Sequence, residues 1–234
     1  MSVLSVVNLK AKIGGRLIVD DASFEVEEGD VFFLLGPNGS GKSTLLKAIV
    51  GYPGVEVVSG RVLYEGVDIT GMPMEERVAR GITLAHQIPP KLVGVKLGGL
   101  LRTLCKKSGC DHEELVNEME INHLVNRDFG KGFSGGELKR AEIALLLAQR
   151  PKLPLIDEPD SGVDVDSIAV IARGVKRLIE SSPHKAAIIV THSALIARYI
   201  PPTKVCVMIK GSIRLCGGRE IVEEVFSHGF KELA

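Results

Sequence analysis

The sequence predicts an α/β fold in which a mainly parallel sheet carries helices on both faces. Three observations support this prediction. From residue 137 onward, segments with helical periodicity alternate with short apolar runs, as in parallel sheets with crossover helices. A glycine-rich loop begins at residue 36, directly after a five-residue apolar run. The first thirty residues alternate apolar and polar side chains in short runs, which is typical of an antiparallel sheet.

The composition bounds the function. The chain has 234 residues, 45% of them hydrophobic, and its 29 basic and 29 acidic residues give zero net charge. This balance offers no electrostatic argument for a nucleic-acid or acidic-lipid surface, so we expect no nucleic-acid partner. No apolar stretch approaches the ~20 residues of a membrane helix, and residues 1–11 lack a signal-peptide pattern. We therefore expect a cytoplasmic protein without direct membrane insertion.

The cysteines predict no disulfide framework. None of the four forms a Cys-x-x-Cys pair. We expect reduced, partly buried thiols, as is usual in the cytosol. A metal or cluster bound by cysteine is the alternative. The four residues are Cys105, Cys110, Cys206 and Cys216.

The N-terminal part predicts an antiparallel β-subdomain. Turns are expected at Gly14-Gly15 and at Glu65-Gly66. A short helix over residues 74–80 and a strand over 82–85 follow. The expected strands of the subdomain cover residues 3–9, 17–19, 23–26 and 60–64.

A phosphate-binding loop, GPNGSGKST, follows the apolar run at residues 31–35 and precedes a predicted helix at 42–50. Its glycines permit backbone angles and close approaches that a Cβ would prevent. Successive N–H groups and the positive end of the helix can then bind phosphates. The alternative is a glycine-rich turn that only links strand to helix. The predicted nucleotide-binding residues are Gly36, Pro37, Asn38, Gly39, Ser40, Gly41, Lys42, Ser43 and Thr44.

The loop motif also assigns individual roles. Lys42 would reach the β- and γ-phosphates, and Ser43 would offer its hydroxyl to Mg²⁺. Thr44 would help to hold the phosphates. The ligands predicted by this motif are ATP and Mg²⁺.

An apolar strand, LPLIDE at residues 153–158, ends in two acids. At the carboxyl end of a parallel strand, Asp157 would face the Mg²⁺ site beside the phosphate loop. Glu158 would orient or deprotonate the attacking water. The alternative is an ordinary strand that ends in an acidic turn. Because Pro154 lacks a ladder N–H, we expect regular pairing to begin just after it.

The remaining pattern is helical and then alternating. From about residue 89 to 131 the periodicity is helical, and Gly109 and Asp111 supply a break and a cap. Further helices are expected at 95–106, 112–119, 137–149, 166–180 and 194–200. Further strands are expected at 153–156, 186–190 and 205–209.

Over nearly its whole length the chain resembles the nucleotide-binding domain of ATP-binding cassette (ABC) proteins. The motifs that carry the resemblance are GPNGSGKST, Gln87 after a strand, FSGGE at 133–137, LIDEPDSGVD at 155–164 and His192 in VTH. The resemblance implies a P-loop NTPase of the ABC ATPase type: a mainly parallel core, an antiparallel β-subdomain and an inserted α-helical subdomain. We expect a single domain over residues 1–234. Its nucleotide-binding core with the β-subdomain would cover 1–88 and 132–234, and the helical subdomain 89–131.

The family's motifs imply further site residues. Gln87 would sense Mg²⁺ and the attacking water, and His192 would contact the γ-phosphate. Taken alone, Gln87 could be a surface amide and His192 an ordinary strand-end histidine. Residues 161–164, ending at Asp164, would form the D-loop at a dimer interface.

The FSGGE segment implies a site shared between two chains. In similar proteins Ser134, Gly135 and Gly136 cap the ATP held by the opposite subunit, head to tail. Ser134 and the backbone of Gly136 would donate to a γ-phosphate bound by the other chain's Lys42. This implies a transient ATP-dependent homodimer and Mg²⁺-dependent hydrolysis of ATP to ADP and phosphate.

The adenine-binding position departs from the family pattern. Cassette ATPases often stack the base on an aromatic side chain ahead of a glycine turn, where this sequence has Ile13. Weak discrimination between bases is therefore a hypothesis, which competition by GTP would test.

Several segments resemble one branch of the family, the ATPase subunit of the SUF iron–sulfur cluster assembly machinery (SufC). In this branch Asp160 stands where transporters usually carry threonine. The resemblance implies an ATPase that acts on a SufB/SufD-like scaffold. The similar segments are residues 51–60, 88–95, 133–143, 157–167, 200–213 and 220–233.

Two other functions stay open. The first is the ATP-binding subunit of an ABC membrane transporter, which uses the same catalytic residues. The second is a catalytically silent, nucleotide-gated binding protein. Against the second, Lys42, Asp157, Glu158 and His192 are all intact.

Overall fold

The computed structural model describes residues 1–230, apart from the side chain of Ala194. The last four residues of the predicted domain, with the end of the similar segment 220–233, lie outside the described residues. The strands are β1 (Ser2–Ile13), β2 (Arg16–Glu27), β3 (Val31–Leu35), β4 (Val55–Tyr64), β5 (Val67–Asp68), β6 (Ile82–Ala85), β7 (Leu153–Asp157), β8 (Ala187–Val190), β9 (Lys204–Ile209) and β10 (Ser212–Gly217). They form one sheet in the order β5-β4-β1-β2-β10-β9-β3-β8-β7-β6.

One end of the sheet is antiparallel, as the sequence predicts. β1 and β2 form a hairpin that turns at Gly14 and Gly15. β4 pairs antiparallel with β1, and the two-residue β5 with β4. The strands are longer than predicted, because the pairing continues through several register shifts where the apolar alternation breaks.

The other end of the sheet is parallel and holds the five strands that the sequence predicts there. β9, β3, β8, β7 and β6 are neighbours in that order. β10, which the sequence does not predict, pairs antiparallel with β9 and touches β2 through Ser212 and Asp21. This contact joins the two ends of the sheet.

The expectation for Pro154 is only half right. β7 pairs with β8 from Leu155 onward, but with β6 it pairs from Leu153. The N–H of Leu153 donates to the carbonyl of Gly81 on the β6 side. Since successive backbone groups of a strand point to opposite sides, the N–H that proline lacks belongs to the β8 side.

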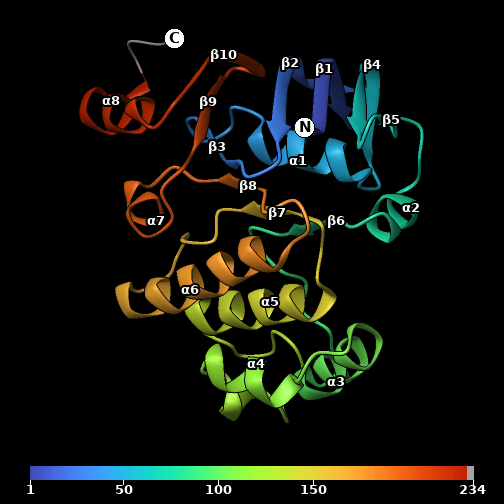
Figure 1. Cartoon of the computed structure of the whole chain (residues 1–234), viewed down its shortest axis with the longest axis vertical. Coiled ribbons are helices and arrows are strands. Elements are labelled where there is room, and N and C mark those ends of the chain that lie inside the picture. Colours follow the sequence, from blue (N-terminus) through green and yellow to red (C-terminus); the bar gives the residue numbers. More distant parts are fainter. Residues whose placement is uncertain (231–234) are drawn as a thin grey trace.

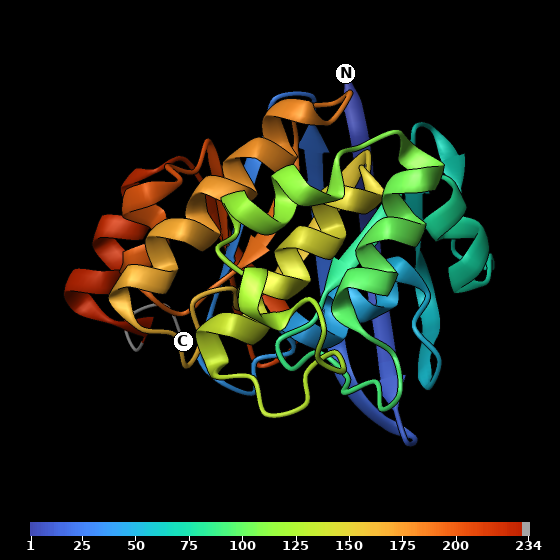
Figure 2. The same ribbon diagram turned by 90° about the horizontal axis from the view of Figure 1, so that it is seen from below.

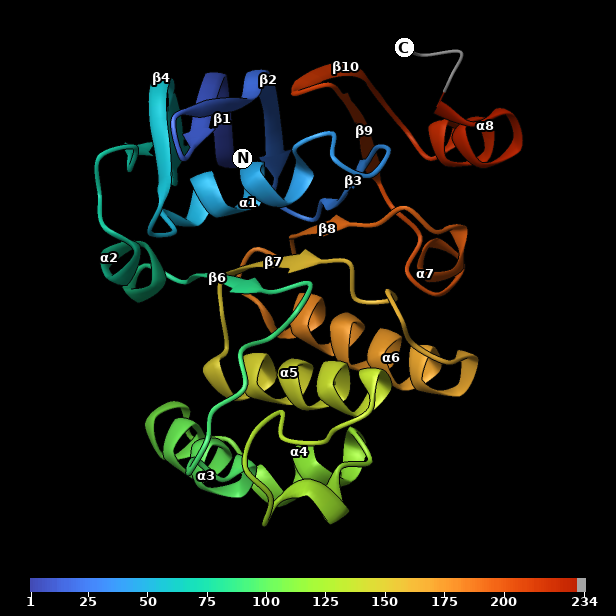
Figure 3. The ribbon, with the colours of Figure 1, turned by 180° about the vertical axis from the view of Figure 1, so that it is seen from behind.

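Helices cover both faces of the parallel strands. Figure 1 shows α1 on one face, with α5 and α6 on the other and α3 and α4 beyond them. Viewed from below, α3 and α4 lie over α5 and α6 (Figure 2). From behind, α7 and α8 lie at the β9–β10 side and α2 near β6 (Figure 3). The helices are α1 (Lys42–Val50), α2 (Met74–Ala79), α3 (Leu97–Ser108), α4 (His112–Glu118), α5 (Gly135–Gln149), α6 (Val165–Ser181), α7 (Ala194–Tyr199) and α8 (Glu220–His228), with a 3₁₀ turn η1 (Asn122–Leu124).

Strand β3 shows why the sheet holds the site in place. Phe32 and Leu34 are fully buried in the apolar cluster that contains α1. Phe33 and Leu35 are fully buried in the cluster that contains α5 and α6. Because both faces are packed, β3 has no freedom to rotate, and the loop that begins at Gly36 leaves the sheet in one direction.

Both ends of α3 and the start of α5 differ from the predictions by two residues. α5 begins at Gly135, two residues earlier than predicted, because Ser134 and Glu137 form a capping box. The amphipathic helix α8 was not predicted. None of the helices within residues 1–230 is both long and apolar enough to pass through a membrane.

The expectation of four reduced cysteines is wrong. Cys105 and Cys110 form one disulfide and Cys206 and Cys216 another, with Cα separations of 4.6 and 4.1 Å. Cys206 and Cys216 lie opposite each other in the β9–β10 ladder. Such a pair arises from strand register, and no local spacing rule such as Cys-x-x-Cys reports it.

Reduction of the disulfides should destabilise the protein. In the chain-entropy account, closing loops of this size contributes about 2–3 kcal/mol per bond. Thermal unfolding with and without a reductant should show a lower melting temperature in the reduced protein. A variant with all four cysteines changed to serine is the control and should not respond to the reductant. Four free thiols in the denatured, unreduced protein would contradict the pairing.

Candidate functional site

The predicted phosphate loop lines a cavity at the start of α1. The cavity has a volume of about 320 Å³ and is lined by Ile18, residues 38–44, Gln87 and Glu158. Helix α1 begins at Lys42, directly after Gly41. Its N-terminal N–H groups therefore belong to the wall of this cavity, where they favour an anion.

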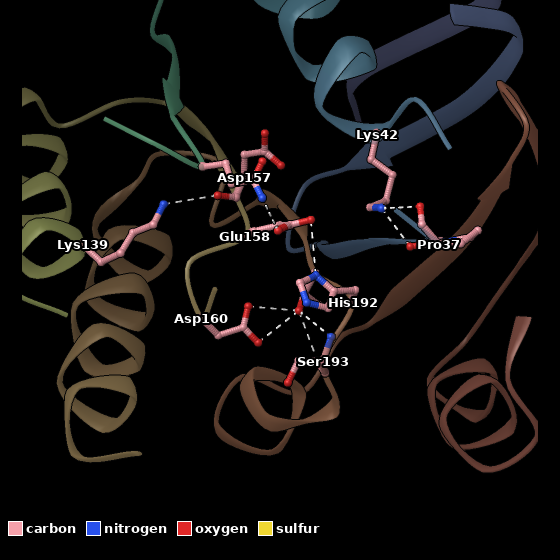
Figure 4. Close-up of polar contacts among 11 residues, drawn as sticks. Pro37, Lys42, Lys139, Asp157, Glu158, Asp160, His192 and Ser193 are labelled. Atoms are coloured by element: carbon pink, nitrogen blue, oxygen red, sulfur yellow. Dashed lines mark hydrogen bonds and ion pairs between the residues drawn. The ribbon is translucent and has the colours of Figure 1, made fainter. Parts of the chain in front are cut away.

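Lys42 is buried within the loop. Its Nζ donates to the carbonyls of Gly36 and Pro37 at 2.8 and 3.0 Å (Figure 4). Burial lowers the pKa of Lys42, while the nearby charges of Glu158 and Asp157 oppose that change. The ammonium is thus held at the loop by two neutral acceptors, which phosphate oxygens can replace with a charge-assisted interaction.

Gly36, the first glycine of the loop, lies too close to β9 for any side chain to fit there. A Cβ built on Gly36 would lie 2.2 Å from the carbonyl oxygen of Met208 in β9. No side chain fits at that distance. The glycine lets the loop turn back against the neighbouring strand.

Three of the predicted catalytic side chains, Glu158, Gln87 and His192, meet beyond the carboxyl ends of the parallel strands. Glu158 follows β7 and is 5% exposed. Its Oε2 accepts a hydrogen bond from Gln87 Nε2 at 2.6 Å, and its Oε1 lies 3.3 Å from His192 Nδ1. Figure 4 shows the Glu158–His192 contact. The fourth, Lys42, lies in the wall of the same cavity as Glu158.

The predicted metal-binding residues also lie together. Ser43, Gln87 and Asp157 line a second cavity of about 260 Å³. Asp157 is 3% exposed, and its Oδ1 has no hydrogen-bond partner within residues 1–230. Burial raises the pKa of Asp157, and the charge of Glu158 adds to the effect.

These residues fit Mg²⁺. A buried carboxylate oxygen without a partner is stabilised by a cation, and the hydroxyl of Ser43 is a second hard oxygen ligand nearby. Mg²⁺ is usually held by one or two protein side chains together with water and phosphate oxygens. The described part of the chain accordingly needs no cluster of three or more acidic, histidine or cysteine ligands, and it holds none.

The Ser134 turn lies elsewhere. Ser134 caps α5: its Oγ accepts from the N–H of Glu137, whose carboxylate accepts from the N–H of Ser134 at 2.7 Å. Ser134, Gly135 and Gly136 are not among the residues that line the phosphate-loop cavity. Within one chain the structure does not bring them to that cavity.

Gly135 and Gly136 lie too close to Gly162 and to the first turn of α6 for either of them to carry a side chain. A Cβ on Gly135 would lie 2.5 Å from the Gly162 carbonyl oxygen, and one on Gly136 would lie 2.4 Å from Ser167 Oγ. Asp164 caps α6 by accepting from the N–H of Ser167 at 2.9 Å. Asp164 therefore lies beside the Ser134 turn of its own chain and not in the wall of the phosphate-loop cavity.

Two isoleucines lie near the start of the β-subdomain in different settings. Ile13 lies at the β-hairpin and is 40% exposed, whereas Ile18, on β2, lines the phosphate-loop cavity. An apolar residue in the cavity wall is thus present, but it is not aromatic. The sequence pattern does not single out Ile18, because it lies in an ordinary apolar run.

A buried ion pair behind the site was not predicted. Glu142 Oε1 accepts from the backbone N–H of His86 at 2.6 Å, and Lys139 Nζ donates to the carbonyl of His86 at 2.5 Å. Lys139 also lies 3.5 Å from Glu142 Oε2 and from the carbonyl of Asp157. Both side chains are less than 10% exposed. They tie α5 to the residue that precedes Gln87.

The fold and the cavity define a P-loop nucleoside triphosphatase. Comparison with known sequences makes the class specific: the family described as "ABC transporter" matches residues 19–161. The chain belongs to this family. It is an ATPase of the ABC type, with ATP and Mg²⁺ as its ligands.

Relatives align along almost the entire chain. The "Probable ATP-dependent transporter slr0075" of Synechocystis is 35% identical over 98% of this chain and 94% of its own length. "Vegetative protein 296" of Bacillus subtilis is 32% identical over 98% and 92%.

Solved structures confirm the predicted fold class. A nucleotide-free ATP-binding cassette from an ABC transporter has a TM-score of 0.79 at 28% identity, covering 97% of this chain and 96% of that one. A dimeric cassette bound to ADP and phosphate has a TM-score of 0.78 over 92% and 98% of the two chains. Its identity is only 22%, so it supports the fold alone.

The buried pair predicts a pH dependence of stability. Burial raises the pKa of Glu142 from 4.5 to about 7. Between these two values the folded chain binds a proton that the unfolded chain has lost, so this residue's contribution to the free energy of unfolding falls as pH rises from about 5 to 7. The Glu142→Gln variant keeps an oxygen acceptor for His86 but does not titrate.

The measurement is denaturant unfolding of both proteins at pH 5 and pH 8. The free energy of wild type minus that of Glu142→Gln should fall by about 1–3 kcal/mol over this interval. The subtraction removes groups that the two proteins share. A difference that does not change with pH would contradict the raised pKa.

Proposed function

We propose that the chain is the ATP-hydrolysing subunit of an iron–sulfur cluster assembly complex of the SUF type. The proposal depends most on one observation at residues 88–95. This segment follows Gln87, resembles the SUF ATPase subunit in sequence and exposes two large apolar side chains, Ile88 at 81% and Val93 at 78%. Exposed apolar groups concentrated in one segment are typical of a surface that binds another protein.

A mostly apolar groove lies beside this segment and supports the same use. It has a volume of about 380 Å³. Its walls come from residues 83–92, from α3 and from α5. We propose that residues 89–131 form an inserted helical subdomain on a core of residues 1–88 and 132–234, and that a SufB/SufD-like scaffold protein docks at this groove.

Glu158 is the proposed catalytic base. Its buried carboxylate is oriented by Gln87 on one oxygen and by His192 on the other, so it can take a proton from a water without first rearranging. Lys42 and the loop residues 36–44 would bind the phosphates. Ser43, Gln87 and Asp157 would hold Mg²⁺, which when bound neutralises phosphate charge.

The site is completed by a second copy of the chain in this proposal. Ser134, Gly135, Gly136 and Asp164 lie away from their own chain's phosphate cavity, so they are free to act on the ATP of a partner. Two copies would close head to tail around two nucleotides. On the scaffold, this closure would change the spacing of the two docking sites and so deform the scaffold where clusters assemble.

A second candidate is the ATP-binding subunit of a membrane transporter. The relatives' names favour it, since several are called ABC transporter ATP-binding proteins or ATP-dependent transporters. The same groove would then receive a membrane subunit. The two candidates share the chemistry and differ in the partner.

Co-purification separates these candidates. From the cells that produce this protein, we expect the chain to recover a soluble scaffold, and Ile88→Glu or Val93→Glu to lose it by placing a charge in the docking surface. Val58→Glu, in a strand on another part of the sheet where the side chain is 39% exposed, is the control and should retain the partner. Recovery of membrane permease subunits by wild type would overturn the SUF assignment.

Mixed variants test the shared site. Lys42→Ala and Ser134→Arg chains should each be inactive alone, whereas a mixture should regain one intact site per mixed dimer, roughly a quarter of wild-type sites for random pairing. ATP hydrolysis in the assembled complex is the measurement.

The role of Glu158 as the base is tested separately in the same assay. Glu158→Gln should bind ATP but lose about 10²–10⁴-fold in turnover. Normal turnover by Glu158→Gln would exclude Glu158 as the catalytic base. In the mixing experiment, no recovery of activity would exclude capping by the opposite subunit.

A further inference from the structure

A buried carboxylate next to the site has no role in the chemistry described so far. Asp160 lies two residues after Glu158 and is 9% exposed. Both of its oxygens lie 3.1 Å from the hydroxyl oxygen of Thr191. A hydroxyl donates one proton, so Asp160 accepts the Thr191 hydrogen bond with either oxygen.

The hydrogen bond to Asp160 orients the Thr191 hydroxyl. The carboxylate of Asp160 at 3.1 Å is a nearer and stronger acceptor for this proton than the carbonyl of Ser193 at 3.3 Å. With its proton directed to Asp160, the oxygen of Thr191 accepts from the N–H of Ser193 at 3.0 Å. Thr191 is completely buried. The two residues on either side of His192 are therefore held to Asp160 through one hydroxyl.

His192 is constrained at both its backbone and its ring. Its ring Nδ1 lies 3.3 Å from Glu158 Oε1, and its flanking residues are held by Asp160. In addition, the N–H of Glu158 donates to the carbonyl of Val190 at 2.9 Å. Figure 4 shows Asp160 pointing toward the segment that carries His192 and Ser193, on the side away from Lys42. Residues 158–160 and 190–193 thus form a closed set of contacts at the ends of β7 and β8.

Burying a carboxylate has a cost that a neutral side chain would avoid. Burial raises the pKa of Asp160, and its hydrogen bond with Thr191 and the proximity of His192 act in the opposite direction. A threonine at this position would offer one hydroxyl in place of two acceptor oxygens. The carboxylate therefore has a specific hydrogen-bonding use at this place.

We propose that Asp160 is a positioning residue that, through Thr191, fixes His192 relative to Glu158 and links both to the segment 161–164. That segment follows Asp160 directly and precedes α6. Any movement of it, such as contact with a second subunit, would be passed to His192 through the buried hydrogen bond. This inference rests on the role given above to His192 in hydrolysis, and it does not depend on which partner binds the chain.

The test is a double-mutant cycle on ATP hydrolysis by the purified complex. Asp160→Leu and Thr191→Val are close in shape to the native residues but cannot make the hydrogen bond, so both should fold without the link. Each should lower kcat about 10- to 100-fold through misplacement of His192, with little change in the ATP concentration for half-saturation or in ATP binding. The double variant should be no slower than the slower single variant, because both remove the same link.

Three controls make the outcome specific. Thr191→Ser keeps the hydroxyl and should retain most of the activity. Asp166→Asn, an exposed acid six residues further along, should leave it unchanged. His192→Ala should be inactive. Unchanged kcat in Asp160→Leu, additive losses in the double variant or a loss confined to ATP binding would overturn the inference. Activity in His192→Ala would overturn the role of His192 as well.

Discussion

The arrangement of the whole site depends on the parallel register of β3, β8 and β7. Leu34 lies opposite Val190, and Val190 lies opposite Asp157. The three strands therefore end at one level, and the chain continues from them into the phosphate loop, into His192 and into Glu158. The apolar packing on both faces of β3 keeps this register from slipping.

The site holds several charged side chains that are buried at the ends of the strands. Lys42, Asp157, Glu158 and Asp160 are all less than 10% exposed. Burying each of these charges costs desolvation energy. Lys42, Glu158 and Asp160 are oriented by hydrogen bonds to neighbouring groups. The Oδ1 atom of Asp157 instead has no hydrogen-bond partner within the described residues. An unused buried acceptor next to a phosphate loop is what a bound cation would stabilise. The electrostatics of the site therefore favour a polyanionic ligand that arrives with a metal ion.

The same fold separates the halves of the proposed active site. Ser134 caps α5, on the opposite face of the sheet from α1, and its turn packs against residues 162–167 of its own chain. This packing makes the turn and the segment before α6 one surface. The buried pair Lys139–Glu142 connects the same helix to His86, the residue before Gln87. Helix α5 therefore links the Ser134 turn, the groove beside residues 88–95 and His86. A partner bound in that groove would be in contact with the helix that carries the capping turn.

Local pattern was sufficient for the strands of the parallel sheet, the start of α1 at Lys42 and the ends of β3 and β7, since apolar runs, glycines and terminal acids report on neighbouring residues. It was also sufficient to place Glu158 among the candidates, whereas Gln87 and His192 were identified only by the resemblance to the ABC family. Pattern failed where residues distant in sequence meet. The Cys206–Cys216 bond, the unpredicted β10, the approach of Ile18 to the cavity, the Lys139–Glu142 pair and the Asp160–Thr191 bond all depend on strand register and helix packing. These contacts are long-range consequences of burying the sheet on both faces, so they cannot be predicted from short stretches of sequence.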